Sequence, residues 1–373
     1  MSTAPQIHKG LAGVVVDRTE ISNVVPETNS LTYRGYPVEE LAASRTFEEV
    51  AHLIWHGELP TTAELAELTA AERSQRELSR STIAQIERLP DNCHPMDVLR
   101  SAVSAFGAED PTEGAAGRDA VLAKSLAMMA RLPTVVALDF RRRHDLPRIA
   151  PDPSLGFSEN FFHMCFGEVP EDEMVRAFDV SLILYAEHSF NASTFTARVV
   201  TSTLSDIYSA VTAAIGALKG PLHGGANEAV MEMMLEIGDP ADAARWLRDA
   251  LEAKRKVMGF GHRVYKRGDS RVPTMRAAMR DVAAARDGSR WVEMYDALEA
   301  EMIALKGIHP NLDFPAGPTY HLMGFDIPMF TPIFVMSRIT GWTAHIVEQM
   351  EANSLIRPLS LYAGQDQRAV PRM

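Results

Sequence analysis

The stretch RWVEMYDALEAEMIALKG, residues 290–307, decides the fold class. Its apolar residues recur mostly at spacings of three and four, the period of one face of an α-helix. They are Trp291, Met294, Tyr295, Leu298, Met302 and Leu305. Lys306 followed by Gly307 is typical of a helix C-terminus. The pattern therefore predicts a helix that ends at Gly307.

The same period runs through most of the chain, for example over residues 122–129 and 178–185. Alternating, strand-like stretches are scarce. The best candidate is Leu11 to Asp17, with Leu31 to Arg34 as a short partner. No stretch reads as a βαβ unit, which disfavours Rossmann and barrel folds. The sequence predicts an all-α fold with a small β element near the N-terminus.

Composition and charge exclude several classes of partner. The 373 residues are 46% hydrophobic and 23% charged, which is ordinary for a globular chain of one or two domains. The net charge is 37 − 49 = −12, which argues against binding nucleic acid or an anionic membrane surface. Charged and polar residues interrupt the apolar stretch 328–347, so no membrane-spanning helix is predicted there.

The cysteines and the first residues bear on the compartment. Cys93 and Cys165 are the only cysteines and form no CxxC, which disfavours a disulfide scaffold or a cysteine-rich metal site. The opening MSTAPQIHKG lacks the apolar core of a signal peptide. We therefore expect a soluble, cytoplasmic protein with reduced thiols.

Three histidines have unusual surroundings. His223 and His262 lie in glycine-rich loops, KGPLHGGAN (219–227) and MGFGHR (258–263). Glycine beside histidine allows the backbone to approach a ligand closely. His188 follows an apolar helical stretch and precedes Ser-Phe-Asn, a position suited to a ligand contact. Such loops in a helical chain suggest a cleft between two lobes.

An aspartate and three arginines complete the set of candidates. Asp313 stands in PNLDFPAGP (310–318), where three prolines and a glycine make a helix interior unexpected. Taken alone, this segment is either a simple Asx or proline turn or a rigid loop that holds Asp313 as a catalytic base. Arg271, Arg338 and Arg357 have small, polar or proline neighbours. Each suits either a carboxylate ligand or a surface ion pair.

Other kinds of site have weaker support. His52 and His56 stand four apart, but Leu53 replaces the glutamate of HExxH, so no metal site is predicted. Gly259-Phe260-Gly261 lacks the third glycine and the preceding strand of a dinucleotide fingerprint. No GxSxG nucleophile elbow is present.

Taken together, the motifs resemble one family. GFGHRVYKRGDSR (259–271) is similar to the citrate synthase signature, in which an arginine follows a histidine by nine residues. The other family segments occur in the same order: LYAEHSFNASTFTARV, GPLHGGANEAV, PNLDFPAG, MSRITGW and SLIRPLS. The likeness runs from about residue 9 to 367. It implies a helical homodimer, with a large domain of residues 1–223 and 320–373 and a small domain of residues 224–319.

The resemblance also implies a reaction. In that family an acyl-CoA condenses with oxaloacetate, and the thioester product is hydrolysed. By the match, Asp313 removes the proton α to the thioester carbonyl, His223 hydrogen-bonds the enol, and His262 polarises the oxaloacetate ketone. A carboxylate can remove so weakly acidic a proton only if the enol oxygen is stabilised.

Binding roles follow from the same match. His188, Arg271 and Arg338 would hold the oxaloacetate carboxylates, together with Arg357 from the partner subunit, so that the dimer shares its active sites. The thioester would be a co-substrate, with no tightly bound cofactor and no metal. Its CoA moiety would lie against Val257, Met258, Gly259, Gly261, Lys266 and Asn311.

The acyl group is harder to assign. The sequences of residues 9–37 and 268–275 resemble those of the methylcitrate synthase branch of the family, whose acyl donor is propionyl-CoA. We expect such an enzyme to accept acetyl-CoA as well, because one methylene contributes only about 1–3 kcal/mol of discrimination. A citrate synthase that uses acetyl-CoA is the alternative. A non-catalytic binding protein on the same scaffold is disfavoured, since a degenerate relative would have lost one of His223, His262 or Asp313.

Overall fold

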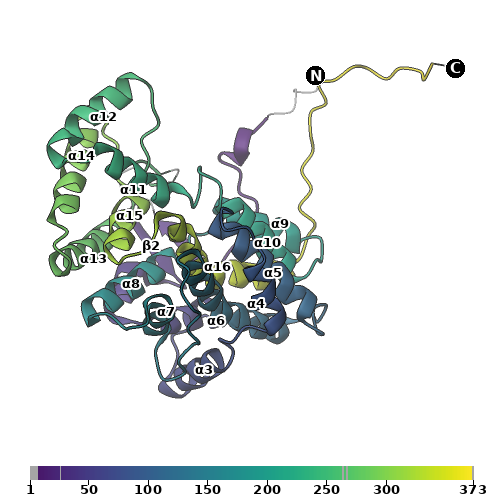
Figure 1. Cartoon of the computed structure of the whole chain (residues 1–373). Helices are drawn as coiled ribbons and strands as arrows, with labels where there is room; N and C mark the ends of the chain where they lie inside the picture. The colour runs from purple at the N-terminus through teal and green to yellow at the C-terminus, as the bar shows by residue number, and fades with distance from the viewer. Residues whose placement is uncertain (1–6, 26, 263, 266–267, 372–373) are drawn as a thin grey trace.

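The computed structural model describes residues 7–371 except 26, 263, 266 and 267, and these residues form helices with one small sheet (Figure 1). The first helices are α1 (Val38–Ser44), α2 (Phe47–His56), α3 (Thr62–Ser74), α4 (Arg80–Glu87), α5 (Pro95–Glu109), α6 (Arg118–Arg143), α7 (Phe157–Phe166) and α8 (Asp172–Tyr185). The later ones are α9 (Ala192–Thr201), α10 (Ile207–Leu218), α11 (Ala226–Ile237), α12 (Ala243–Glu252), α13 (Val272–Ala285), α14 (Ser289–Lys306), α15 (Asp313–Leu322) and α16 (Phe330–Glu351). Short 3₁₀ turns lie at Lys9–Leu11, Pro240–Asp242 and Ile327–Met329. The predicted all-α class is confirmed.

The helix expected from the opening stretch is α14. It begins at Ser289 and ends at Lys306, and Gly307 follows in the left-handed conformation at φ 64°. Glycine reaches that conformation without the strain a Cβ would cause, which is why it terminates the helix. Trp291, Met294 and Leu298 are all buried, as the spacing predicts.

The small sheet is present, but one predicted strand is wrong. The sheet has antiparallel strands β1 (Ser22–Val25), β2 (Ser30–Tyr33) and β3 (Tyr36–Pro37) in sequential order. The predicted segment 31–34 nearly coincides with β2, whereas Leu11–Asp17, described throughout, forms no strand. Gly10 and Gly13 have positive φ angles of 61° and 75° and turn the chain there. Several of its apolar side chains line a cavity instead of pairing in a sheet.

The proline-rich segment around Asp313 is helical, contrary to expectation. Asp313 is the first residue of α15, and Pro315 falls within its first turn. Backbone N–H groups in a first turn have no partner within the helix, so a proline there loses no hydrogen bond. Only Pro318 lies deeper in the helix. The number of prolines in a segment therefore does not exclude a helix, because the effect of each proline depends on its position.

Two long helices form the centre of the molecule. α16 is buried along almost its whole length and packs against α2, α6, α8, α9 and α10. α6 has the length and apolar composition of a membrane-crossing helix, but 72% of its most apolar 18-residue stretch is buried inside the fold. Burial of this kind is typical of a core helix, and α6 packs directly on α16.

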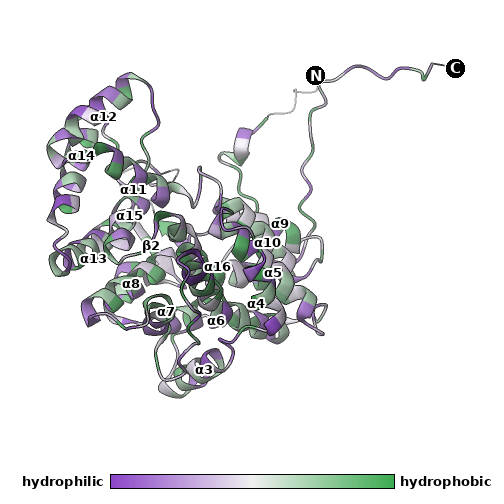
Figure 2. Cartoon of the chain, viewed as in Figure 1, coloured by the Kyte–Doolittle hydropathy of each residue, from purple (hydrophilic) through white to green (hydrophobic). Residues whose placement is uncertain are grey.

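Helices α11 to α15 group together on one side in Figure 1, joined by contacts of α12 with α14 and of α13 with α15. Figure 2 shows α12 and α14 striped in purple and green, so each presents both a polar and an apolar face. α13 also packs on α8, and α11 on α16, which connects this group to the rest. The domain boundaries at residues 224 and 319 stay a prediction.

Candidate active site

A cavity of about 960 Å³ collects most of the predicted site residues. Those that line it are His188, His223, Val257, Met258, Gly259, Gly261, His262, Arg271, Asn311, Asp313 and Arg338. Lys266 lies outside the described residues. Arg357 is exposed on the segment after α16, which extends away from the helical body (Figure 1), and it does not line the cavity of its own chain. Its expected role in a partner's site stays a prediction.

Asp313 is held at the start of α15 by two polar neighbours. The hydroxyl of Tyr185 donates to its Oδ1 at 2.7 Å, and its own N–H donates to Asn311 Oδ1 at 3.1 Å. Burial raises the pKa of Asp313 to about 6, against the opposing Tyr185 hydrogen bond and the charge of Arg271. A carboxylate with that pKa is ionised near neutral pH and more basic than an exposed one.

His223 is fixed in one neutral form. The backbone N–H of Ser193 donates to its Nε2 at 3.2 Å, and the Ser193 hydroxyl lies 2.8 Å from the same atom. A backbone N–H can only donate, so Nε2 is the acceptor and the ring proton sits on Nδ1. Burial, and then the charge of Arg338, lower the pKa of His223 to about 3. The ring therefore offers a neutral N–H donor.

His262 has the opposite tautomer. Its Nδ1 accepts the N–H groups of Val264 and Tyr265 at 3.1 and 3.3 Å, which leaves the proton on Nε2. Burial and the charge of Arg271 lower the pKa of His262 to about 4, although Asp269 opposes them. The ring centroid lies 5.0 Å from that of His188. Two histidines thus present donor nitrogens of fixed identity.

Backbone hydrogen bonds join the His262 loop to the Asp313 segment. Gly261 N donates to His309 O at 2.8 Å, and Asn311 N donates to Gly259 O at 2.9 Å. The Asn311 side chain adds a bond from Nδ2 to Gly261 O at 2.9 Å. Gly259 has φ 80°, and a Cβ there would lie 2.7 Å from Val230 Cγ2. Glycine is required because neither the backbone angle nor the space admits a side chain.

This arrangement can carry out proton abstraction next to a carbonyl, with neutral donors for the oxygen that becomes negative. The chain also matches the family model described as "Citrate synthase, C-terminal domain" over residues 10–359. It belongs to the citrate synthase family.

Relatives within the citrate synthase family carry two names. The chain is 66% identical to the 2-methylcitrate synthase of Mycobacterium tuberculosis, over 98% of this chain and 93% of that one. It is 65% identical to the citrate synthase of Mycolicibacterium smegmatis, over 99% and 98% of the two chains. Among solved structures, a Thermoplasma acidophilum citrate synthase in complex with carboxymethyl coenzyme A and oxaloacetate superposes with a TM-score of 0.94, at 34% identity and 99% coverage of both chains.

Two arginines of this citrate synthase family site are held in place by hydrogen bonds to neighbouring protein groups. Arg271 makes a bidentate ion pair with Asp269, in which Nε donates to Oδ1 at 2.9 Å and Nη2 donates to Oδ2 at 2.7 Å. Arg338 donates from Nε to the Tyr185 carbonyl at 2.6 Å. Burial lowers the pKa of Arg338 to about 10, so it stays charged at neutral pH.

Two buried nitrogens at the cavity have no partner within the described residues, Arg338 Nη1 and His188 Nε2. Burial, and then the charge of Arg271, hold the pKa of His188 well below its usual value. Buried polar atoms are normally hydrogen-bonded, so unpaired ones beside a cavity indicate where a polar ligand binds. Arg338 Nη1 can only donate, and a carboxylate is the ligand that suits an arginine donor.

Sequence reasoning missed Tyr185, Ser193 and Asp269. Tyr185 fits the helical period of its segment, and nothing in that local pattern points to its partner Asp313, which is 128 positions away. Asp269 stands two residues before Arg271, a spacing that could have suggested the ion pair. Within the described residues, no group of three or more His, Cys, Asp or Glu side chains is placed to hold a metal ion.

Proposed function

We propose that this member of the citrate synthase family is a 2-methylcitrate synthase, which condenses propionyl-CoA with oxaloacetate and hydrolyses the thioester to release CoA. The observation that carries the proposal is one cavity lined by a basic carboxylate and two neutral histidines with assigned tautomers. Identity of 66% to a protein named for this activity supports it.

Each proton has a defined place in the proposed reaction. Asp313 takes the α-proton of the acyl-CoA, the electron pair of that C–H bond forms the C=C bond of the enolate, and the carbonyl π electrons move onto the oxygen. His223 Nδ1–H stabilises the oxygen of the former thioester carbonyl as charge develops. His262 Nε2 gives its proton to the ketone oxygen of oxaloacetate, which becomes a hydroxyl group, while the enolate carbon attacks the ketone carbon. Water then cleaves the thioester and CoA leaves as the thiol.

Binding of oxaloacetate is assigned to the cationic end of the cavity. Arg271, Arg338 and His188 would hold its carboxylates, and the unpaired Arg338 Nη1 and His188 Nε2 support this. Arg357 would come from the partner subunit of a homodimer. CoA would follow residues 257–261 and Asn311, and Lys266, which lies outside the described residues, is the cation proposed to bind its phosphates. We also assign the enzyme to the cytoplasm, a setting that suits two unpaired cysteines.

Citrate synthase activity with acetyl-CoA is the second candidate. The 65% identity to a protein named citrate synthase favours it directly. The two acyl groups differ by one methylene, so a few side chains around Asp313 and Tyr185 decide between them at about 1–3 kcal/mol.

Release of free thiol tests both candidates. We expect CoA release from propionyl-CoA only in the presence of oxaloacetate, and a higher kcat/KM for propionyl-CoA than for acetyl-CoA. A clear preference for acetyl-CoA would assign the chain to the second candidate. No thiol release with either substrate, from folded protein, would refute the catalytic proposal altogether.

A further inference from the structure

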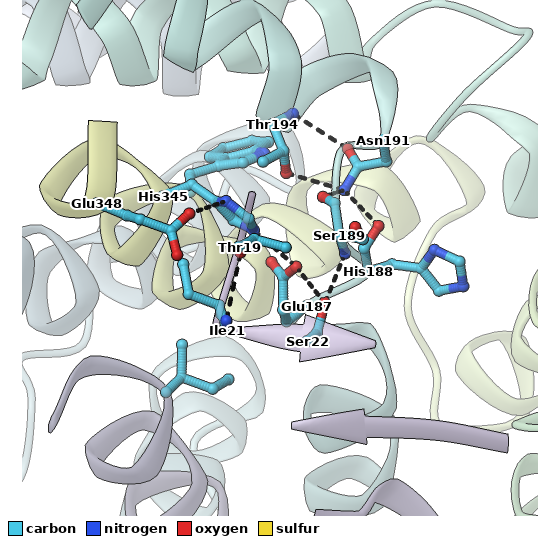
Figure 3. A network of polar contacts seen from close by, with 12 residues as sticks. Thr19, Ile21, Ser22, Glu187, His188, Ser189, Asn191, Thr194, His345 and Glu348 are labelled. Atoms are coloured by element: carbon cyan, nitrogen blue, oxygen red, sulfur yellow. Dashed lines mark hydrogen bonds and ion pairs between the residues drawn. The ribbon is translucent and has the colours of Figure 1, made fainter. Parts of the chain in front are cut away.

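A buried polar network lies directly behind the cavity and takes no part in the chemistry above (Figure 3). Glu187 and His345 are both fully buried, with His345 Nε2 at 2.9 Å from Glu187 Oε1. Burial alone would raise the pKa of Glu187, but the charge and hydrogen bond of His345 outweigh it and keep the pKa low. A buried ion pair is weak evidence of stability, so its position matters more.

The network is adjacent to the ligand-binding residue His188. Figure 3 shows the Glu187 side chain turned toward Ser22 and His345, while the neighbouring His188 ring points away from them. His188 lines the cavity. Because the two residues are consecutive, whatever fixes the Glu187 carboxylate also fixes the backbone that carries the His188 imidazole.

Two hydroxyl groups hold the backbone on both sides of His188. Tyr33 donates to Glu187 O at 3.0 Å and accepts its N–H at 3.3 Å. Ser22 donates to Glu187 Oε1 at 2.9 Å and accepts the N–H of Ser189 at 2.8 Å. Ser189 has φ 49°, a left-handed conformation that is strained for a residue with a Cβ. Because the Ser22 hydroxyl donates its proton to the Glu187 carboxylate, a lone pair of the Ser22 oxygen is free to accept the N–H of the strained Ser189.

The same pair fixes α16 against this segment. Arg338 and His345 are seven residues apart on α16, two turns along one face. Arg338 Nε donates to the Tyr185 carbonyl, and Gly341, between them, has no room for a Cβ against the Ala186 carbonyl. The face of α16 that carries a cavity cation therefore also carries the partner of Glu187.

The network also reaches the N-terminal segment. Arg198, nearly fully buried, donates to Glu348 Oε2 at 2.7 Å and to Asp17 Oδ2 at 3.1 Å, and its Nη1 lies 3.2 Å from His345 Nδ1. Asp17 directly follows the stretch 10–16, most of which lines the cavity. Three separate walls of the cavity are thus connected behind it.

We propose that Glu187 and His345 are positioning residues, which hold His188 and Arg338 at the spacing that the carboxylates of one dicarboxylate ligand require. They do not touch the ligand, and they act through the backbone of residues 187–189 and through α16. The identity of the ligand as oxaloacetate rests on the proposed function, whereas the positioning role rests on the contacts above.

Steady-state kinetics of Glu187→Gln, His345→Gln and the double variant test this role. We expect KM for oxaloacetate to rise about tenfold, with kcat and KM for acyl-CoA changed less than about threefold, because ligand binding is lost without loss of chemistry. The double variant should be no worse than the poorer single one, since the pair acts as a unit. Unchanged KM for oxaloacetate, or an equal loss in all three constants, would overturn the proposal.

A matched control separates positioning from general stability. Glu72→Gln removes another buried carboxylate, which lies in α3 and pairs with Arg76 at 2.7 Å, away from the cavity. It should lower Tm without raising KM for oxaloacetate, and a rise equal to that of Glu187→Gln would contradict the proposal. If Glu187→Gln does not fold, Ser22→Ala serves instead, because it leaves every charge in place and frees the Ser189 amide. It should raise the same KM about threefold, and an unchanged KM would overturn the proposal.

Calorimetric titration of oxaloacetate into the same full-length proteins separates the two proposals. If the wild type binds oxaloacetate but releases no thiol, the proposed function fails while the positioning role is still decided by Kd. Weaker binding by Glu187→Gln but not by Glu72→Gln supports positioning, and equal Kd values refute it. A wild type that binds no oxaloacetate refutes both.

Discussion

The hydroxyl of Tyr185 governs how basic Asp313 is. It donates to the carboxylate at 2.7 Å, and this bond stabilises the ionised form while burial disfavours it. The balance gives a base whose pKa of about 6 is higher than that of an exposed aspartate yet still below neutral pH. Two opposing effects on one side chain therefore set the pH range of the proposed reaction.

The pH dependence of turnover follows from this balance. The carboxylate must be ionised to accept the α-proton, so kcat should be full above pH 7 and fall as the pH drops through about 6. The measurement is kcat against pH at saturating substrates. An acid limb centred near pH 4 would show that burial does not raise the pKa of this base.

Tyr185→Phe should move the acid limb of the kcat–pH profile to higher pH. Removing a hydrogen bond worth about 1 kcal/mol raises the carboxyl pKa by roughly half to one pH unit. Tyr320→Phe is the matched control, because Tyr320 is also buried but its hydroxyl donates to Ser181 at 3.0 Å. The same shift in both variants would mean that Tyr185 has no specific effect on Asp313.

At the scale of elements, close packing of α16 on the 185–188 segment has a signature that can be measured. Gly341→Ala places a methyl group against the carbonyl of Ala186 and the carboxylate of Glu187. We expect a loss of about 1–3 kcal/mol in the free energy of unfolding, since overpacking outweighs the better helix propensity of alanine. Denaturant unfolding measures it.

Gly216→Ala in α10 is the control for this change. A Cβ at Gly216 would meet nothing within 4 Å, so the same substitution should stabilise the protein by up to about 1 kcal/mol. Opposite signs at the two glycines are expected. Stabilisation at both would show that α16 can move away from the segment without cost.

Local periodicity predicted the helices well. In α14, for example, the apolar face and the terminating Gly307 can both be read from the helix's own sequence. It failed where tertiary contacts determine the structure. The apolar alternation of residues 11–17 reflects a cavity wall, and the first-turn position of Pro315 makes α15 possible. The candidate site followed from ordered motifs. Tyr185 escaped notice because only the folded chain brings it to Asp313.

Across the whole molecule, the charge of −12 first appears to disfavour anionic substrates. The cavity carries its own balance, with Arg271 and Arg338 buried in its wall and the three histidine rings neutral by their lowered pKa values. Surface charges are screened within about 8–10 Å at physiological salt, so the charges and hydrogen-bond donors that line the cavity matter more to a bound carboxylate than the average charge of the surface. The acidic surface still argues against nucleic-acid partners.

The proposed sharing of sites between subunits can be tested by complementation. Asp313→Ala and Arg357→Ala should each be nearly inactive alone. Mixed and allowed to exchange subunits, they should regain about a quarter of wild-type activity, because one site of each heterodimer has both residues. No recovery, with heterodimers verified by mass spectrometry, would place Arg357 outside the partner's site.

The hydrogen bonds between residues 259–261 and 309–311 have a consequence for recombining relatives. They join the loop of His262, the proposed polarising residue, and the segment of Asp313, the proposed base, into one hydrogen-bonded unit, although Gly261 and Asn311 lie 50 positions apart in the chain. A chimera with a crossover between these segments would combine halves that evolved with different partners. Crossovers placed before Val257 or after α15 would transfer the unit intact, and libraries built that way should retain more active members.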